Sequence, residues 1–321
     1  MKKSTKDNKL MLRCEFRGQV QRIERHLPGG EKRSKATHYG NEPVLSTEDG
    51  RKILVAAIKR GGPFMAARFG TSEGETLYAY HKKQLSGKSE KAYSEKCTRE
   101  MCVNAGFFPN STEMIDKWAE LETEACADLD LLGVMNFLGE EWIYRTFCSQ
   151  AKLMPTGGLA SASKGWAWCL EGKKVLVIHP FTDTIRSQYE NHRAEIFPGT
   201  NALPEFDLKC VKAVQTIADA VDDRFADWFE ALDYMTEEAA KQDFDVALIG
   251  CGAYGFQLAS RIKRMGKVAV HMGGSLQTLF GIKGSRWDKQ YGSMYNDAWV
   301  YPSAAETPAG AERVEGGCYW K

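Results

Sequence analysis

Short apolar runs alternate with amphipathic stretches along most of the chain. The runs at 64–69, 174–179, 246–249 and 268–271 are typical of buried strands. Between them lie stretches with apolar residues at three- and four-residue steps, the spacing of one helix face. This alternation predicts an α/β fold, Rossmann-like, with a mainly parallel sheet and helices on both faces.

The pattern also places the individual elements. Ser46 or Thr47 can cap a helix that runs to about Lys59. Further helices are expected over 73–83, 112–132, 140–148, from 182 onward, 222–241 and from the glycine turn after 249 to 265. Further extended segments are expected at 134–138, 152–154, 195–197 and 208–214.

The first 36 residues are strongly basic, with eleven Lys or Arg against four Asp or Glu. Within them Leu12, Phe16, Val20, Ile23 and Leu27 recur at helical spacing and predict a basic amphipathic helix. Such a helix either lies on an anionic membrane surface or docks its apolar side on the body of the protein. We favour docking.

Composition narrows the class of protein. The chain has 321 residues, 43% of them hydrophobic and 26% charged, enough for a sizeable core. The net charge of +1 argues against a general nucleic-acid binder, and no apolar run approaches the roughly 20 residues that cross a bilayer. Nine cysteines without a Cys-x-x-Cys pair indicate reduced thiols, and the polar start 1–9 does not resemble an export signal. We therefore expect a cytoplasmic protein, and peripheral contact of the basic leader with the inner face of the membrane stays open.

Glycines follow two of the predicted strands. Gly250, Gly252 and Gly255 come directly after the run 246–249, and Gly273 and Gly274 follow 268–271. Glycines at such turns let the backbone approach a phosphate and aim helix N–H groups at it. A nucleotide or its sugar conjugate is therefore the expected ligand.

Two other interpretations of these glycines stay open. A dinucleotide fingerprint expects an acidic residue about 20 residues on, at the end of the next strand. The chain has His271 there, which disfavours NAD or FAD. Alternatively, the glycines serve only the packing of helix against strand.

Four strand ends carry candidate ligand groups, at 68–75, 179–183, 250–255 and 271–275. In parallel sheets ligands collect at the carboxyl ends of the strands, so one shared cleft is expected. Glu73 and Glu75 in the first segment either bind Mg²⁺ or Mn²⁺ or complement a helix dipole.

Three segments resemble the bacterial glycosyltransferases of the GT-D fold. The segment 67–73 resembles the family's strand followed by Arg, an apolar residue, Gly and Asp-x-Glu. The segments 172–181 and 248–274 are similar to its later strand and to its two glycine turns. The family's Asp falls on Thr71 here, and its Glu is Glu73.

The resemblance implies a transferase that takes a sugar from a nucleoside diphosphate donor, with a divalent Mn or Mg ion bridging carboxylates and diphosphate. With Thr71 in place of the Asp, either Glu75 supplies the second carboxylate or cationic side chains stabilise the leaving diphosphate. The expected acceptor is a glycan, lipid-linked or protein-linked acceptor.

The predicted site follows from these arguments. The catalytic candidates are Glu73, His179 and Asp183, and the metal candidates are Glu73 and Glu75. The substrate-binding candidates are Arg68, Gly70, Thr71, Ser72, Gly250, Gly252, Tyr254, Gly255, His271, Gly273, Gly274, Lys283 and Arg286. For the histidine, the acids and the loop cations, ordinary core, capping and surface roles are the alternatives.

The expected organisation is a basic leader over 1–45, helical or partly disordered, a Rossmann-like glycosyltransferase-type domain over 46–300, and a C-terminal extension over 301–321. An NAD(P)-dependent oxidoreductase and a non-catalytic nucleotide-binding protein on the same fold are the alternative functions.

Overall fold

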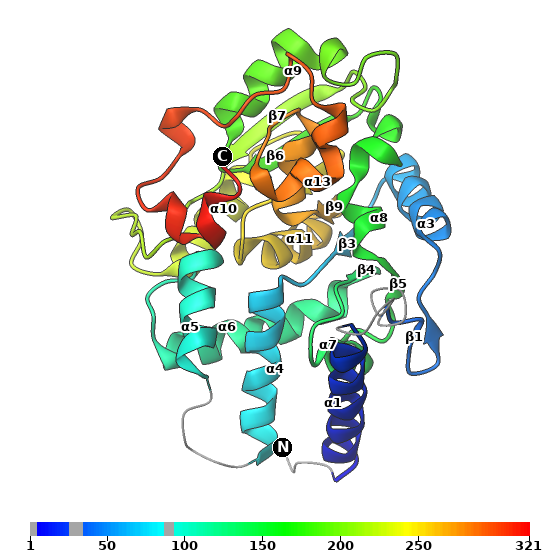
Figure 1. Ribbon diagram of the computed structural model, residues 1–321, viewed down its shortest axis with the longest axis vertical. Helices are drawn as coiled ribbons and strands as arrows, with labels where there is room; N and C mark the ends of the chain where they lie inside the picture. Colours follow the sequence, from blue (N-terminus) through cyan, green and yellow to red (C-terminus); the bar gives the residue numbers. More distant parts are fainter. Residues whose placement is uncertain (1–4, 26–34, 87–92) are drawn as a thin grey trace.

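A parallel sheet forms the centre of the molecule (Figure 1). The computed structural model describes residues 5–25, 35–86 and 93–321. Within them the sheet has seven parallel strands, in the order β5-β4-β3-β9-β8-β6-β7. The strands are β3 (Phe64–Ala67), β4 (Leu131–Val134), β5 (Lys152–Pro155), β6 (Lys174–His179), β7 (Asp207–Lys212), β8 (Val246–Ile249) and β9 (Val268–His271). The predicted α/β class is confirmed.

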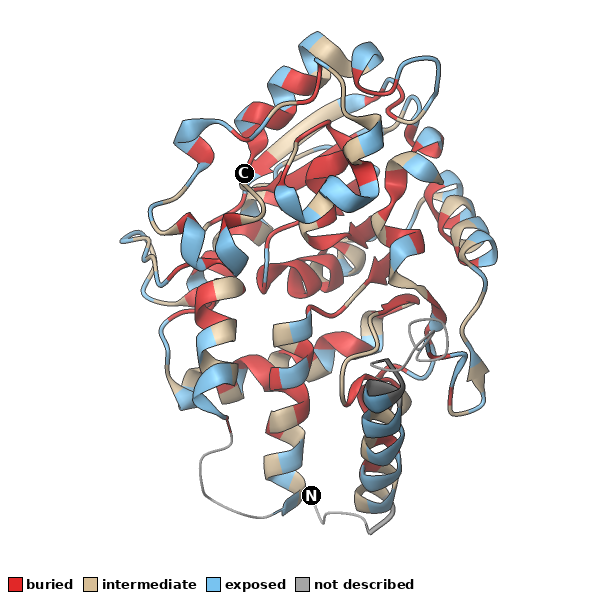
Figure 2. Cartoon of the chain, viewed as in Figure 1, coloured by how far each residue is buried: buried red, intermediate tan, exposed pale blue. Residues whose placement is uncertain are grey.

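Alternate strand residues enter two separate hydrophobic clusters. Met65 and Ala67 belong to one cluster, while Phe64 and Ala66 belong to the other. Side chains alternate between the two faces of a strand, so both faces of the sheet are buried, as a parallel sheet requires. Figure 2 shows the buried residues concentrated on the sheet and on the helix sides that face it.

Helices cover both faces, as predicted. One cluster receives side chains from α4 (Thr71–Ser86), α6 (Thr112–Ala125), α7 (Glu140–Phe147), α10 (Trp228–Ala240) and α11 (Tyr254–Arg264). The other receives them from α3 (Thr47–Arg60), α8 (Thr156–Ala160), α9 (Thr182–Ile196), α12 (Leu276–Leu279) and α13 (Asp288–Tyr291). Ser46 caps α3 as expected, because its hydroxyl accepts from the Asp49 N–H at 3.0 Å.

Some element boundaries differ from the prediction. The helix expected over 112–132 ends at Ala125, and Leu131 already belongs to β4. In place of the strand expected at 134–138, the structure has β4, which begins earlier, at Leu131. The segment 195–197 is not extended, because Ile196 ends α9.

The N-terminal helix α1 (Thr5–Arg25) docks on α7, but not through the predicted residues. Met11 and Cys14 are its buried side chains, and Gly18 approaches Leu138 so closely that an added Cβ would lie 2.8 Å from Cδ1. The predicted apolar side is exposed instead, with Leu12 and Phe16 at 65% and 69% exposure. Leu27 lies outside the described residues.

The ends of the described chain pack on the body. The short strands β1 (His38–Tyr39) and β2 (Glu42–Pro43) pair, and Tyr39 is buried. Ala311 and Val314 are buried near the C-terminus. In the part of the chain that the structure describes, no helix combines the length and the apolar composition that crossing a bilayer needs. The predicted division at 45 and 300 stays a prediction.

Candidate functional site

A cavity of about 160 Å³ lies at the carboxyl edge of the sheet. The segments that follow β3, β6, β8 and β9 all line it, so the strand ends meet as the sequence predicts. The predicted site residues that line the cavity are Arg68, Gly70, Thr71, Ser72, Glu73, His179, Gly250, Gly252, Tyr254, Gly273, Gly274 and Arg286. Glu73 and Gly252, which are 179 positions apart in the sequence, thus line the same cavity.

Arg68 directly follows β3, and the glycine turn after β9 makes room for its guanidinium. A Cβ on Gly273 would lie 2.0 Å from Arg68 Nη2, and Gly273 has a φ of +63°. The φ value favours glycine, because other residues rarely adopt this backbone conformation, and a side chain there would displace the Arg68 guanidinium. Arg68 Nη1 donates to the Phe69 carbonyl at 3.1 Å. The second glycine turn therefore holds a cation at the cavity.

Glu73 lies in the first turn of α4 with its carboxylate folded back over Gly70. A Cβ on Gly70 would lie 1.8 Å from Glu73 Oε2, so a larger residue at position 70 would displace the Glu73 carboxylate. Burial raises the pKa of Glu73, and the nearby Arg68 partly offsets the effect. A half-buried carboxyl with a raised pKa beside a cation is the kind of group that can accept a proton in a reaction.

His179 ends β6 and is fully buried. Its Nδ1 accepts the Phe181 N–H at 3.0 Å, so in the neutral ring the proton is on Nε2. Burial lowers the pKa of His179 to about 3. The Nε2–H group therefore remains as a donor for a ligand. No ring nitrogen is free to accept a proton, which argues against the predicted role of His179 as a base.

The glycine turn after β8 lets a neighbouring carbonyl approach the start of α11. Gly252 has a φ of +57°, and a Cβ there would lie 2.5 Å from the Ala105 carbonyl oxygen. That oxygen accepts the Ala253 N–H at 2.9 Å. Gly252 and Tyr254 line the cavity, so the start of α11, with the positive end of its dipole, lies at the cavity edge.

Two predicted ligand residues are packed beneath this turn. Gly255 and His271 do not line the cavity. A Cβ on Gly255 would lie 2.1 Å from His271 Cε1, and His271 Nδ1 lies 3.3 Å from the Ile249 carbonyl. Burial lowers the pKa of His271 to about 3, so the ring is neutral. For these two residues the packing interpretation fits better than ligand binding.

Three more predicted residues lie away from the cavity. Lys283 Nζ stands over the rings of Tyr295 and Tyr301, 5.6 and 5.8 Å from their centroids. Asp183 is exposed, and its carboxylate pairs with Lys212 at 3.1 Å. Glu75 is exposed on α4 and is not part of the cavity wall. The cavity wall includes neither Lys283 nor Asp183, and their proposed roles in substrate binding and as a base stay predictions.

Helix geometry separates the two carboxylates of the predicted metal pair. Glu73 and Glu75 are two residues apart on one helix, and residues at that spacing point to different sides. Among residues 5–25, 35–86 and 93–321, no group of three or more His, Cys, Asp or Glu side chains can hold a metal ion. The donor set thus does not fit an ion held by this pair.

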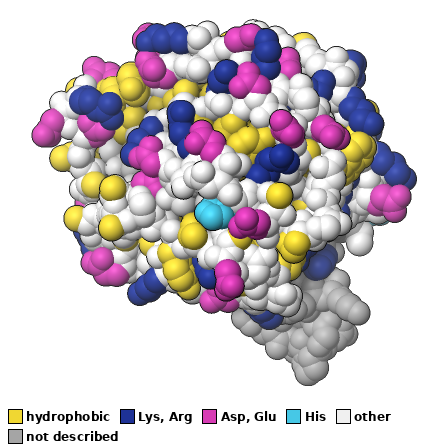
Figure 3. Space-filling model, turned by 90° about the horizontal axis from the view of Figure 1, so that it is seen from above, with side chains coloured by type: hydrophobic (Ala, Val, Ile, Leu, Met, Phe, Trp, Pro, Cys, Tyr) yellow, Lys and Arg dark blue, Asp and Glu magenta, His cyan; other side chains and the backbone are white. Residues whose placement is uncertain are grey.

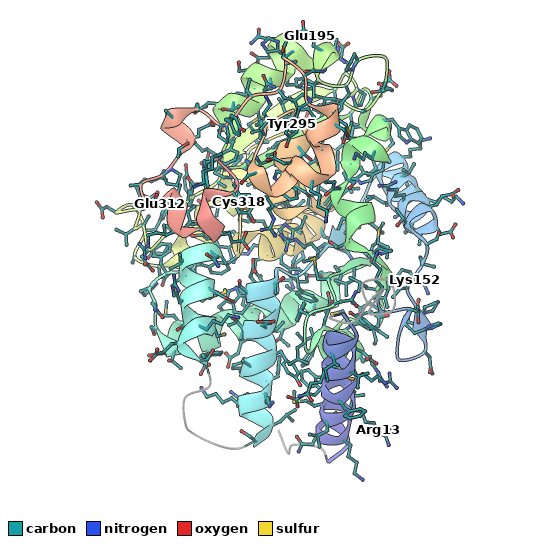
Figure 4. All side chains as sticks on the ribbon, viewed as in Figure 1. Arg13, Lys152, Glu195, Tyr295, Glu312 and Cys318 are labelled. Atoms are coloured by element: carbon teal, nitrogen blue, oxygen red, sulfur yellow. The ribbon has the colours of Figure 1, made fainter. Side chains whose placement is uncertain are left out.

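The C-terminal segment forms part of the cavity wall, which the sequence did not reveal. Val314, Glu315, Tyr319 and Trp320 line the cavity. Gln277 Nε2 donates to the Tyr319 carbonyl at 3.1 Å and fixes this segment. Figure 4 labels Glu312 and Cys318 on these turns. Since no periodicity marks the segment, only its run of aromatic residues, Tyr319 and Trp320, was a usable signal.

Arg286 is the second cation at the cavity, and it pairs with Glu315. The Tyr319 hydroxyl also donates to Glu315, at 3.1 Å. Both members of the ion pair are about two-fifths exposed, at 40% and 39%, so solvent screens the pair and it is weak. An anionic ligand would compete with Glu315 for Arg286.

Two carboxyls of the core, Glu140 and Glu122, are buried and hydrogen-bonded. Glu140 accepts the N–H groups of Met135 at 3.0 Å and Asn136 at 2.5 Å, and so holds the turn after β4 that brings Met135 to the cavity. Burial raises the pKa of Glu140 to about 7. Glu122 on α6 accepts from Gln257 at 2.7 Å, and burial raises its pKa to about 8.

Two loops complete the wall, at 104–106 and 214–217. Thr216 joins them, because its hydroxyl donates to the Gly106 carbonyl at 2.6 Å and lies 3.0 Å from the Tyr254 hydroxyl. Neither segment carries a sequence signal that predicts a binding loop, since the elements before them have an ordinary composition.

No protein-family model and no curated protein matches this chain. Its fold is similar to two solved structures of the domain of unknown function 1792. One is described as a highly conserved domain with a distinct glycosyltransferase fold. Its alignment with this chain has a TM-score of 0.47 and 13% sequence identity, and it covers 85% of this chain and 91% of the matched chain. The other, substituted with selenomethionine, has a TM-score of 0.46, 12% identity and the same coverage of 85% and 91%.

Proposed function

We propose that this protein is a glycosyltransferase that moves a sugar from a nucleoside diphosphate donor to a glycan, lipid-linked or protein-linked acceptor. One observation supports this most: Arg68, Arg286 and the start of α11 meet in a cavity that also holds Glu73. Guanidinium groups and helix N-termini are the usual protein partners of a diphosphate. The resemblance of the strand ends to glycosyltransferases of the GT-D fold supports the same ligand.

The proposed chemistry assigns a role to each charged group. As the acceptor hydroxyl attacks the anomeric carbon, its proton passes to the Glu73 carboxylate. The bond from that carbon to the diphosphate oxygen breaks, and the diphosphate leaves with the electron pair. Arg68 and Arg286 stabilise the charge that develops on it. The raised pKa of Glu73 makes it a stronger base than an ordinary carboxylate.

The geometry favours this function over a nicotinamide-dependent oxidoreductase. The strand next to β8 ends in His271, which is buried and packed on Gly255. It therefore cannot hold a ribose in the way an acidic residue would.

Glu73→Gln tests the proposal, with Glu75→Gln as the matched control from the same helix. We expect Glu73→Gln to lower the rate of donor hydrolysis or transfer about 100- to 10,000-fold, because it removes the base. Glu75→Gln should change the rate less than twofold. Activity is measured by release of nucleoside diphosphate from a panel of nucleotide sugars. A Glu73→Gln variant that is as active as the wild type would exclude Glu73 as the base. If the wild-type protein itself acts on none of the donors, a non-catalytic binding protein would be favoured.

A further inference from the structure

Large apolar side chains project into solvent from one side of α1. Across residues 5–25, 35–86 and 93–321, the exposed large hydrophobic residues are Leu12, Phe16, Val20, Ile23, Trp168, Val221 and Tyr301. Four of these seven are on α1. We call Leu12, Phe16, Val20 and Ile23 the exposed stripe.

The exposed stripe is continuous along the helix. At 3.6 residues per turn its four side chains fall within an arc of about 80° and extend over about 16 Å. Met11, Cys14 and Gly18, which contact the body of the protein, point to the opposite side. The stripe is therefore not the margin of a buried face, and Figure 2 shows the outer side of α1 largely exposed.

The helix is held firmly enough to present this surface. Arg17 Nη1 pairs with Glu141 of α7 at 2.9 Å, and Glu15 pairs with Lys82 of α4 at 2.7 Å. Cys14 is buried against the same cluster as α7, and burial raises its pKa to about 11. The stripe therefore faces outward as part of the folded molecule.

The charges beside the exposed stripe have one sign. Of the α1 side chains that the structure describes, the exposed charged ones are Lys9, Arg13 and Arg17, and all three are basic. Lys9 and Arg13 fall within or next to the arc of the stripe. By contrast, Figure 3 shows acidic and basic side chains interspersed over the face at the top of Figure 1.

We propose that the exposed stripe of α1 lies on an anionic lipid surface, with its apolar side chains among the acyl chains and Lys9 and Arg13 at the headgroups. An apolar stripe with basic flanks is the pattern of helices that bind in the plane of a membrane. A second copy of this chain is a less suitable partner, because pairing two stripes would bring basic residues against basic residues. Figure 4 labels Arg13 at the far end of the long axis from Glu195 of α9.

Vesicle flotation with the full chain tests this inference. We expect binding to vesicles with 30% phosphatidylserine, tenfold weaker or undetectable binding to pure phosphatidylcholine, and further weakening in about 0.5 M salt. Phe16→Asp should lower the partition coefficient at least tenfold, and Arg13→Gln about fivefold. Val221→Asp, which places the same charge on another exposed apolar residue, should leave it unchanged.

Three results would overturn the inference. The first is the absence of wild-type binding to anionic vesicles. The second is unchanged binding by Phe16→Asp with an unaltered circular dichroism spectrum. The third is a dimer in solution that Phe16→Asp dissociates without any vesicle binding, which would make a second copy the partner. Because no nucleotide is present in this assay, its outcome is independent of the glycosyltransferase activity.

Discussion

Gly273 positions Arg68, although it has no side chain of its own. An alanine at 273 would place Cβ 2.0 Å from Arg68 Nη2 and would also strain a backbone with φ of +63°. Gly266→Ala is the matched control, since Gly266 has a φ of +81° and nothing within 4 Å of the added Cβ.

We expect both variants to lose about 1–3 kcal/mol of unfolding free energy from backbone strain. Gly273→Ala alone should weaken nucleoside diphosphate binding, by about tenfold or more, because it displaces a charged donor. Urea unfolding and calorimetric titration measure the two effects. Equal affinity of the two variants would show that Arg68 does not contact the ligand.

Glu122 should make the stability of the protein depend on pH. In the unfolded chain its pKa is near 4.5, and burial raises it to about 8 in the fold. Between these values the folded state binds more protons than the unfolded state, so stability falls as the pH rises from about 4.5 to 8. Glu122→Gln removes this dependence.

Relative to wild type, the Glu122→Gln variant should therefore gain stability with rising pH, by an amount on the order of a few kcal/mol between pH 5 and 8. Unfolding midpoints of both proteins at pH 5, 6, 7 and 8 give the comparison. The buried histidines contribute equally to both proteins and cancel in the difference. A difference that is constant over this range would mean that Glu122 is ionised in the fold.

At the scale of elements, the C-terminal segment controls one of the two cations of the cavity. Glu315 pairs with Arg286 where a diphosphate would have to bind. Glu315→Gln should therefore tighten diphosphate binding, by up to about fivefold, since an ion pair this exposed contributes about 1 kcal/mol or less. Glu312→Gln, on the same turns but outside the cavity wall, should leave the affinity unchanged. Weaker binding by Glu315→Gln would instead make Glu315 a contact of the ligand.

The strand ends were predictable because each carries a local signal. Gly250, Gly252 and Gly273 follow apolar runs, and a parallel sheet gathers such turns at one edge. The loops at 104–106 and 214–217 and the C-terminal wall were not predictable, because tertiary packing alone brings them to the cavity.

The hydrophobic pattern does not predict which side of α1 docks on the body of the protein. Periodicity identified the apolar side of the helix correctly, but the side that docks is the one with Met11, Cys14 and Gly18. The close approach of Gly18 to Leu138, which lies just before α7, depends on the shape of the docking surface, and periodicity does not encode that shape. For α6 and β4 the apolar residues around Leu129 fit a helix and a strand equally well, so the boundary was misplaced.

At the scale of the whole molecule, the parallel sheet brings distant loops to one edge and α1 presents its exposed stripe elsewhere on the surface (Figure 1). A transferase with these two features would bind its donor at the sheet edge while α1 holds it near an acceptor at a lipid surface. Donor binding and lipid binding are then separable by mutation.

The most direct test of the account is calorimetric titration of UDP and GDP into wild-type protein, Arg68→Ala and Arg60→Ala. Arg60 is an exposed arginine at the end of α3, outside the cavity wall, and serves as the matched control. We expect one of the two diphosphates to bind the wild type with a stoichiometry of one, to bind Arg68→Ala at least tenfold more weakly, and to bind Arg60→Ala with unchanged affinity. Absence of binding by either diphosphate, or equal binding by Arg68→Ala and wild type, would contradict it.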